Sequence, residues 1–415
     1  MTGMAANRDR DRPGRRVVIT GVGPVASIGI GVADFAEGLA AGRNGVSPIS
    51  VFDTTGYAHA NGCEVRGFTP TVTSRPPQKL GRATQFSVTA AALALADAAV
   101  DPRDLTNRPG LVSVGTTDGE SKDLDFLTEL AVREGPENLP AQVVGRVPAN
   151  WLSASIAHEF GLRAAESVTL PTACAAGNYA IGYAYDVLTL GEADYALCGG
   201  ADAMCRKTFT GFYRLGTIAP EVCQPFDNDR KGILTGEGSG ILYLETLDSA
   251  RERGAHIYAE ILGYGMTCDA SHPVAPNRDS IADCMRRAHQ QAGIKPSDVD
   301  LISAHGTGTK ANDYTEAAAI HEVFGSGPPP TVSMKSMMGH TMGAASALAA
   351  IGCAIAIDRE FIPPTVNHRT ADPELRLDCV PTFARPATLN IVQNNAFAFG
   401  GNNAILILAR PRETR

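Results

Sequence analysis

The residues whose types could perform covalent chemistry lie in glycine-rich or small-residue turns. Cys174 stands within the small-residue segment 171–177, between the apolar run 167–170 and a helical pattern that starts near Asn178. This order predicts a strand, a sharp turn and the start of a helix. A cysteine in such a turn is presented to a site, and the positive end of the helix dipole favours its thiolate form. The pattern therefore predicts a nucleophilic cysteine.

Two histidines occupy comparable places further along the chain. His305 follows the predicted strand 300–304, and His340 stands between the predicted strand 331–334 and an Ala-rich helical run. Strand ends in α/β proteins are where ligands bind. Uncharged imidazoles in such turns can donate hydrogen bonds to an oxygen that becomes negative during a reaction. With Cys174 they form the set that a thiol-based acyl chemistry needs.

The composition describes an ordinary globular protein without a metal or cofactor signature. The chain has 415 residues, of which 44% are hydrophobic and 19% charged. Its net charge of −8 argues against a general nucleic-acid binder. The nine cysteines include no Cys-x-x-Cys pair, so neither a disulfide framework nor a zinc site is predicted, and a reducing cytoplasmic location fits best. The pair Gly21 and Gly23 lacks the third glycine of a dinucleotide fingerprint, because position 26 is alanine.

Two segments are candidates for a targeting or a membrane element. Residues 1–15 are polar and lack the apolar core of a secretory signal, so we predict a disordered tail. The longest apolar helix candidate, 343–357, falls short of the roughly 18 apolar residues that a membrane span requires. We therefore predict a buried core helix and no membrane span.

The larger organisation is that of an α/β protein, because predicted strands and helices alternate throughout. The glycine turns 236–240 and 400–403 each lead into an apolar strand. This repetition suggests two similarly built halves in one tightly joined body. We predict a first half, 16–253, that contains Cys174 and a second half, 254–411, that contains both histidines.

These motifs resemble, in type and order, those of the β-ketoacyl-acyl-carrier-protein synthases. The resemblance rests on residues 172–174, 305–309, 335–340 and 397–401 and extends over roughly 16–410. It implies an elongating ketosynthase of fatty-acid or type II polyketide kind. It also implies an α/β thiolase fold, in which two duplicated halves form a five-layered αβαβα sandwich. Such proteins are dimers, and we expect the strand around residues 195–198 to build the subunit interface.

The resemblance implies an acyltransferase that performs a decarboxylative condensation. Cys174 would take an acyl group from a carrier thioester, with the N–H groups of Cys174 and Phe399 as the oxyanion hole. A malonyl thioester would then lose carbon dioxide, and His305 and His340 would donate through Nε2 to the enolate oxygen. Attack of this carbanion on the acyl-cysteine would give a β-keto chain two carbons longer. The substrates would be carried on the phosphopantetheine of acyl carrier protein, and neither a cofactor nor a metal is expected.

Further roles follow from the same resemblance. Lys335 is expected to pair with Glu316 and hold the histidine turns, and a purely structural salt bridge is an equal alternative to a direct role. The remaining expected substrate contacts are pantetheine contacts by Thr307 and Thr309, a gate at Phe399 and a pocket wall at Phe212.

The sequence also departs from the family pattern. Residues 273–275 lack a hydroxyl where the family often has one, and Asn402 stands where threonine is common. Asp118, in the turn 116–119, would place a carboxylate near the acyl pocket, and burying it unpaired would cost several kcal/mol. We therefore hypothesise that the natural acyl chain is not an ordinary saturated one.

Several alternatives remain open at this point. A housekeeping fatty-acid synthase would share every catalytic residue with a polyketide ketosynthase. A non-catalytic chain-length factor would lack the nucleophile, and a thiolase or coenzyme-A-dependent synthase would use other partners of the cysteine. The dimer could be a homodimer or a heterodimer with a chain-length-factor-like homologue. An acidic carrier protein should meet a local basic patch, for which the candidates are Arg206, Lys207 and Arg214.

Overall fold

The strands of the two halves occupy the same order in the sheet. From its outer edge inward, the first half contributes β6 (Ala165–Leu170), β5 (Gly110–Gly115), β7 (Tyr195–Asp202), β9 (Gly238–Thr246) and β1 (Val17–Ala26). The second half contributes β12 (Thr331–Val332), β11 (Leu301–Ser303), β15 (Ile391–Phe397), β16 (Asn402–Ala409) and β10 (Ala259–Cys268). The two sets meet where β1 pairs antiparallel with β10. The same order in both sets is the mark of an internal duplication.

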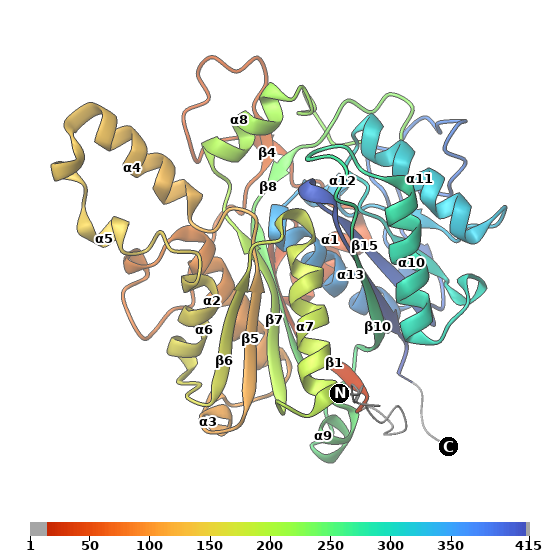
Figure 1. Cartoon of the computed structure of the whole chain (residues 1–415), viewed down its shortest axis with the longest axis horizontal. Coiled ribbons are helices and arrows are strands. Elements are labelled where there is room, and N and C mark those ends of the chain that lie inside the picture. Colours follow the sequence, from red (N-terminus) through yellow and green to blue (C-terminus); the bar gives the residue numbers. More distant parts are fainter. Residues whose placement is uncertain (1–14, 412–415) are drawn as a thin grey trace, which may run out of the picture.

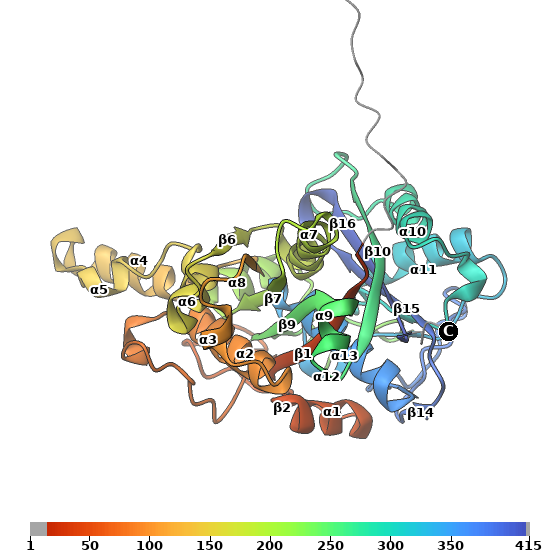
Figure 2. The same cartoon turned by 90° about the horizontal axis from the view of Figure 1, so that it is seen from below.

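Helices separate and cover these two sets of strands (Figures 1 and 2). α7 (Ala176–Leu190) and α13 (Ala345–Arg359) pack on each other and contact strands of both halves. α2 (Arg82–Asp97) and α6 (Trp151–Phe160) cover the outer face of the first half. On the second half, α10 (Arg278–Ala292) packs on β10 and β16, with α11 (Lys310–Phe324) against it. The layers are therefore αβαβα, and the predicted thiolase fold is confirmed.

The central helices approach closely because their facing residues are small. A Cβ at Gly177 of α7 would lie 2.7 Å from the backbone nitrogen of Ala347 in α13. α13 and the turn before it, Met342–Arg359, reach the length and hydropathy of a membrane span, so the sequence argument from length was too strict. In the structure 89% of this segment is buried inside the protein. It forms the core helix that the sequence predicted.

This computed structural model describes residues 15–411, so nearly all of the predicted disordered tail lies outside the described residues. Shorter elements connect the layers. They are α1 (Val32–Ala41), α3 (Pro102–Leu105), α8 (Arg206–Arg214), α9 (Leu247–Glu252), α12 (Lys335–Met338), β2 (Gly29–Ile30), β3 (Ser47–Pro48), β4 (Asn61–Cys63), β8 (Thr235–Gly236), β13 (Phe361–Ile362) and β14 (Arg385–Pro386).

The expectation that residues 195–198 build a subunit interface is wrong. They belong to β7, which pairs with β5 on one side and with β9 on the other, and all of its residues are buried. The strand at the outer edge of the first half is β6, where Glu166 and Ser167 are exposed. Any strand pairing with a partner at this end of the sheet would therefore involve β6.

One segment projects from the body beside β6. α4 (Ser121–Glu134) and α5 (Ala141–Val144) form an arm that extends away from the layers in both views (Figures 1 and 2). We call it the α4–α5 arm. Its exposed apolar side chains are Leu124, Phe126, Val132 and Val144, which are 45, 49, 83 and 45% exposed.

Candidate active site

Cys174 lies in a tight turn between β6 and α7. The turn is a short 3₁₀ helix, Ala173–Ala175, and Ala173 adopts a left-handed conformation with φ of 51°. β5 approaches this turn so closely that a Cβ at Gly115 would lie 2.3 Å from the carbonyl carbon of Ala176. The sulfur-bearing side chain is only 6% exposed, and it lines a pocket. The strand, turn and helix start predicted for this segment are observed.

The surroundings of Cys174 act on its ionisation in opposite directions. Burial raises the pKa of the Cys174 thiol to about 12, while the positive charge of Lys335 acts in the opposite direction. Burial therefore opposes the thiolate that the helix dipole favours, and Lys335 supports it.

The turn of His305 is held from two sides by charged groups. Glu316 accepts the backbone N–H of His305 and of Gly306, each at 2.8 Å. Lys335 Nζ donates to the carbonyl oxygen of His305 at 2.6 Å. The expected ion pair between Lys335 and Glu316 is thus replaced by separate contacts of each to the His305 turn. Glu316 lies on α11 beyond the first turn of the helix, which begins at Lys310.

His340 is fixed by its backbone and by its ring. It follows α12, its N–H donates to the carbonyl of Leu234 at 2.7 Å, and its own carbonyl accepts the N–H of Gly236 at 2.8 Å. Its Nδ1 accepts the N–H of Met342 at 3.1 Å. A neutral imidazole whose Nδ1 accepts carries its proton on Nε2. This contact therefore makes Nε2 of His340 a hydrogen-bond donor.

The surroundings of both histidines favour the neutral imidazole. The ring centroids of His305 and His340 are 5.6 Å apart, with the rings nearly perpendicular at 84°. Burial, then the charge of Lys335, lowers the pKa of both imidazoles well below the ordinary value. Burial also lowers the pKa of Lys335, and Glu316 opposes this shift. The pair thus fits two uncharged donors that face a developing oxyanion.

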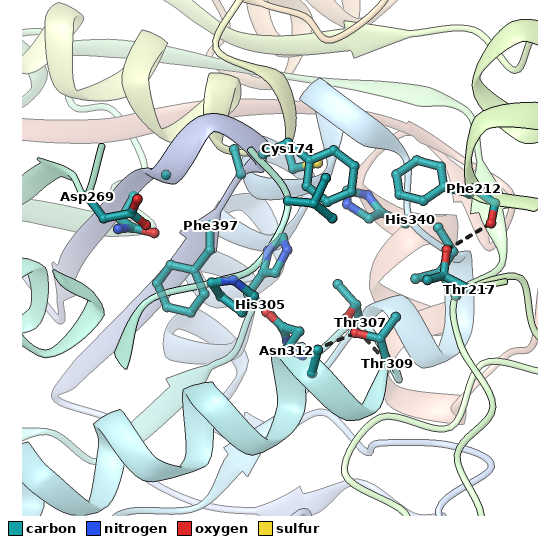
Figure 3. Close-up of a pocket in the computed structure, with 18 residues that line it drawn as sticks. Cys174, Phe212, Thr217, Asp269, His305, Thr307, Thr309, Asn312, His340 and Phe397 are labelled. Atoms are coloured by element: carbon teal, nitrogen blue, oxygen red, sulfur yellow. Dashed lines mark hydrogen bonds between the residues drawn. The ribbon is translucent and has the colours of Figure 1, made fainter. Parts of the chain in front are cut away.

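Cys174, His305 and His340 meet at one pocket of about 120 Å³ (Figure 3). They come from three separate turns, one in the first half and two in the second. The other residues that line the pocket are Phe212, Thr217, Ile233, Asp269, Val274, Pro276, Thr307, Thr309, Ala311, Asn312, Phe397, Ala398, Phe399, Gly401 and Asn403.

The predicted substrate-contact residues lie around the same pocket. The Thr307 and Thr309 hydroxyls are 2.9 Å apart, and Thr309 also caps α11 by accepting the N–H of Asn312 at 3.3 Å. The ring of Phe212 lies 5.5 Å from that of Phe399 and 6.4 Å from that of His340, centroid to centroid. Phe399 is 39% exposed at the pocket, a position that suits a gate.

The backbone N–H groups around the pocket differ in their partners. Ala398, Gly400 and Gly401 donate their N–H groups to protein carbonyls. Among the turn and loop bonds of residues 15–411, none uses the N–H of Cys174 or of Phe399. Both residues line the pocket, which is compatible with the predicted oxyanion hole.

Asp118 does not fit the argument that the sequence suggested for it. Its carboxylate pairs with Lys207 Nζ at 2.7 Å and accepts the hydroxyl of Thr208 at 2.6 Å. It is also not among the residues that line the pocket. The cost of an unpaired buried carboxylate therefore does not arise, and the hypothesis of an unusual acyl chain loses this support.

The departure at residues 273–275 does reach the pocket. Val274 lines it and is 40% exposed, and Pro276 lines it too. An apolar wall therefore stands where the family often offers a hydroxyl. Asp269, which also lines this side, packs so closely on Gly401 that a Cβ there would lie 2.3 Å from its Oδ1.

Two members of the candidate basic patch already have ion-pair partners. Lys207 pairs with Asp118 as described, and Arg206 lies 3.3 Å from Glu129. Arg214 ends α8. Lys231 and Lys310 instead line a hollow next to the catalytic pocket, with which it shares Thr217, Thr309 and Ala311. Sequence reasoning missed these two lysines, because only the fold brings them to one place.

Other pocket residues also escaped the sequence analysis. Asn312 follows the Thr309 cap by three residues, and its Nδ2 donates to Asp313 at 3.1 Å. The capping pattern was the signal that could have identified it. Thr217 and Ile233 come from irregular segments that carry no recognisable motif. Within residues 15–411, no group of three or more His, Cys, Asp or Glu side chains could hold a metal ion.

Two family models match the chain. The model described as "Beta-ketoacyl synthase, N-terminal domain" matches residues 14–250, and "Beta-ketoacyl synthase, C-terminal domain" matches residues 258–369. The chain is 36% identical over 405 residues to 3-oxoacyl-[acyl-carrier-protein] synthase 2 of Synechocystis sp., an alignment that covers 94% of this chain and 97% of that protein. It is 35% identical over 407 residues to nodulation protein E of Rhizobium sp., covering 94% and 98%.

Solved structures show the same likeness. The ishigamide ketosynthase/chain length factor superposes with a TM-score of 0.95 at 53% identity, covering 96% of this chain and 100% of the other. A type II polyketide synthase ketosynthase, solved with its acyl-carrier protein and bound to the hexaketide, superposes with a TM-score of 0.88 at 29% identity and the same coverage. A β-ketoacyl synthase from Burkholderia phymatum gives 0.89 at 30% identity, with coverage again of 96% and 100%.

Proposed function

Because the chain belongs to the β-ketoacyl synthase family, and is thus an acyltransferase, we propose that it is the ketosynthase subunit of a type II polyketide synthase. It condenses an acyl group on Cys174 with malonyl-acyl carrier protein and yields β-ketoacyl carrier protein and carbon dioxide. The meeting of Cys174, His305 and His340 at one pocket carries this proposal. The 53% identity to the ishigamide ketosynthase/chain length factor, against 36% to the Synechocystis synthase, favours the polyketide pathway.

The first half-reaction is transfer of the acyl group to Cys174. The sulfur attacks the carrier thioester carbon, the bond from that carbon to the pantetheine sulfur breaks, and the departing thiolate takes the proton that Cys174 gives up. Because burial opposes a resting thiolate, attack and proton loss belong to one step. The N–H groups of Cys174 and Phe399 hold the oxyanion.

The second half-reaction is decarboxylation and condensation. The bond between the malonyl carboxylate and C2 breaks, and carbon dioxide leaves. The electron pair of that bond stays with C2 and forms an enolate with the thioester carbonyl. His305 and His340 donate to the enolate oxygen, and His340 does so from Nε2 because Nδ1 is engaged by Met342. C2 then attacks the acyl-cysteine, and the Cys174 sulfur leaves and regains a proton. No metal or organic cofactor enters these steps.

The carrier protein presents both substrates on its phosphopantetheine arm. The hollow beside the pocket holds Lys231 and Lys310 at the side of Thr309, and it is the place where an acidic carrier would meet positive charge. Replacing both lysines by glutamate should raise KM for malonyl carrier protein while kcat changes little.

The protein works with a second subunit. The outer edge of β6 and the apolar side chains of the α4–α5 arm lie at one end of the molecule and form the face for this partner. The partner is a chain-length-factor-like homologue, by likeness to the structure that is named for both a ketosynthase and a chain length factor. Co-purification of the two chains would support this arrangement, and a stable active homodimer would contradict it.

The second candidate is a housekeeping fatty-acid elongation synthase. It is favoured by the names of several similar proteins, which are 3-oxoacyl-[acyl-carrier-protein] synthases. A non-catalytic chain-length-factor-like role is disfavoured, because Cys174 and both histidines are present and share a pocket.

The decisive experiment is intact-mass spectrometry of the purified protein with its co-expressed partner. The protein is exposed first to hexanoyl carrier protein and then to malonyl carrier protein. We expect a hexanoyl adduct that is absent in Cys174→Ala and that malonyl carrier protein discharges as a β-keto chain two carbons longer. No adduct with any carrier or partner would overturn the proposed function.

A second arm of the experiment separates the two pathways. Hexanoyl, 2,4-hexadienoyl and acetoacetyl carrier proteins are compared as donors of equal or similar length. A polyketide ketosynthase should elongate the unsaturated or oxygenated chains faster than the saturated one. Exclusive use of the hexanoyl chain would support housekeeping fatty-acid elongation instead.

A further inference from the structure

A buried carboxylate lies directly behind the turn that carries His340. Asp202 is the last residue of β7 and is 0% exposed. Its Oδ1 accepts the hydroxyl of Thr116 at 2.6 Å and the N–H of Asp118 at 2.9 Å. Its Oδ2 accepts the N–H of Thr117 at 2.8 Å and of Gly343 at 2.6 Å. Four donors on two oxygens hold this carboxylate in one orientation.

The Gly343 contact connects Asp202 to the catalytic histidine. Two successive N–H groups of the same turn donate hydrogen bonds. The N–H of Met342 donates to His340 Nδ1, and the N–H of Gly343 donates to Asp202 Oδ2. Met342 has φ of 52°, a conformation that residues other than glycine rarely adopt and that its surroundings must maintain. The Asp202 bond is the next contact along the backbone that can maintain it.

The fit between these segments is close. A Cβ at Gly343 would lie 2.5 Å from the Cα of Thr116 and 2.7 Å from Asp202 Oδ2. The turn therefore cannot move toward β7, and a loss of the hydrogen bond would release it in the other direction. A small displacement there would change the distance from Met342 N to His340 Nδ1.

We propose that Asp202 is a positioning residue for His340. By holding the N–H of Gly343 it fixes the Met342 turn, which keeps the proton of His340 on Nε2 and aims that donor at the pocket. This inference rests on the proposed function, because it concerns the hydrogen bond from His340 to the enolate. Asp202 itself touches no substrate and does not line the pocket.

The charges around Asp202 are compatible with this role. A second carboxylate that acts on Asp202 is Asp118, which pairs with Lys207 and accepts the hydroxyl of Thr208. Burial and the charge of Asp118 raise the pKa of Asp202, and its hydrogen-bond donors oppose that rise. All four partners of Asp202 donate, so the geometry fits the ionised form.

The test compares the two half-reactions in Asp202→Asn. The side-chain amide of asparagine places an NH₂ group opposite N–H or O–H groups that donate to Asp202 in the wild type. The two donors repel each other, so the Met342 turn must shift. Acylation of Cys174 by hexanoyl carrier protein is followed by intact mass, and carbon dioxide release from malonyl carrier protein is measured separately. We expect carbon dioxide release to fall roughly 10- to 100-fold, as for a misplaced catalytic group, while the acylation rate stays within about threefold.

Glu120→Gln is the matched control. Glu120 is 1% exposed and accepts the hydroxyl and N–H of Thr84, each at 2.6 Å, together with the N–H of Ala83 at 3.3 Å. It has the same kinds of donors as Asp202 but no contact with the His340 turn. Its loss should lower the melting temperature without changing the ratio of the two half-reaction rates.

Outcomes of this test separate the inference from the proposed function. If Asp202→Asn lowers both half-reactions equally, or neither, Asp202 is only structural and the inference is overturned. If Asp202→Asn does not fold, Thr116→Val is used instead, because it removes only one of the four donors to Asp202. It should lower the ratio of carbon dioxide release to acylation in the same direction, by a smaller factor. A wild-type protein that releases no carbon dioxide would contradict the proposed function instead.

Discussion

The two halves of the molecule build the same turn and use it differently. Each half places a residue with φ close to 50° in a short 3₁₀ helix, Ala173 at 51° and Met342 at 52°. Each turn leads into a central helix of 15 residues, α7 or α13. The next position is Cys174 in one half and Gly343 in the other. The shared backbone therefore does not assign the chemistry, which depends on the side chain at this one position.

The contrast extends to the anion that each turn binds. The N–H of Gly343 is occupied by the carboxylate of Asp202, which ends β7. The equivalent strand of the other half, β15, ends at the apolar Phe397, and no turn or loop bond within residues 15–411 uses the N–H of Cys174. In the second half the protein supplies the anion permanently. In the first half the site is open to an oxyanion that exists only during the reaction. Hydrogen bonds to this oxyanion therefore stabilise the transition state more than the bound substrate.

The strongest test of this contrast is Cys174→Ala. Removal of the sulfur should abolish the acyl adduct and lower condensation by at least about 10³-fold, because no other group can store the chain. Stability should change by less than about 1 kcal/mol, since alanine is a small residue like its neighbours Ala173 and Ala175 and the left-handed position Ala173 is left unchanged. Intact mass and urea unfolding measure the two effects. An adduct that persists in this variant would place the nucleophile elsewhere.

The second test separates the contributions of the two halves. His340→Ala and His305→Ala should each lower carbon dioxide release from malonyl carrier protein by roughly 10²- to 10³-fold, the cost of losing one oxyanion donor. Acylation of Cys174 should remain within a few-fold, because its oxyanion donors are backbone N–H groups. Equal loss of both half-reactions would show that the histidines also serve acylation.

The third test measures stability at Gly343, the position of the second half that is equivalent to Cys174. Gly343→Ala should destabilise the protein by about 1–3 kcal/mol, because its Cβ would lie 2.5 Å from the Cα of Thr116. Gly211→Ala in α8 is the matched control, since a Cβ there meets nothing within 4 Å. It should be neutral or stabilise by up to about 1 kcal/mol. Urea unfolding of both variants measures the difference.

The parts of this site that the sequence predicts are those that local pattern determines. Cys174 and His305 each follow a strand and precede small residues, and His340 follows a glycine just before an Ala-rich run, so their turns could be located without the fold. The duplication could be inferred as well, because the glycine turns before β9 and β16 leave a local trace.

The parts that could not be predicted depend on contacts between distant segments. Asp118 looked like an unpaired carboxylate because Lys207 lies 89 positions away along the chain. Lys335 was expected to pair with Glu316, and only the fold shows that both bind the His305 backbone. The interface strand was misjudged because β7 is apolar on both faces, which marks an internal strand as well as an interface. The polar residues of β6 were the better signal of an edge.

The smallest expected effect concerns how the second half responds to acid. Burial and Lys335 lower the pKa of His305 and His340 below the ordinary 6.5, so below that pH the unfolded chain binds more protons than the folded one. Stability from these groups is complete above about pH 6.5 and is lost as the pH falls further. Asp313, whose pKa burial raises to about 6, acts in the opposite direction and partly masks the loss.

The comparison of His340→Gln with wild type isolates the contribution of this histidine to the pH dependence of stability. Between about pH 6.5 and 5, the variant should lose less unfolding free energy than wild type, by up to about 1.4 kcal/mol per pH unit, as measured by urea titration. Identical pH slopes would mean that folding leaves the pKa of His340 unchanged, and the argument that burial keeps this imidazole neutral would have to be abandoned.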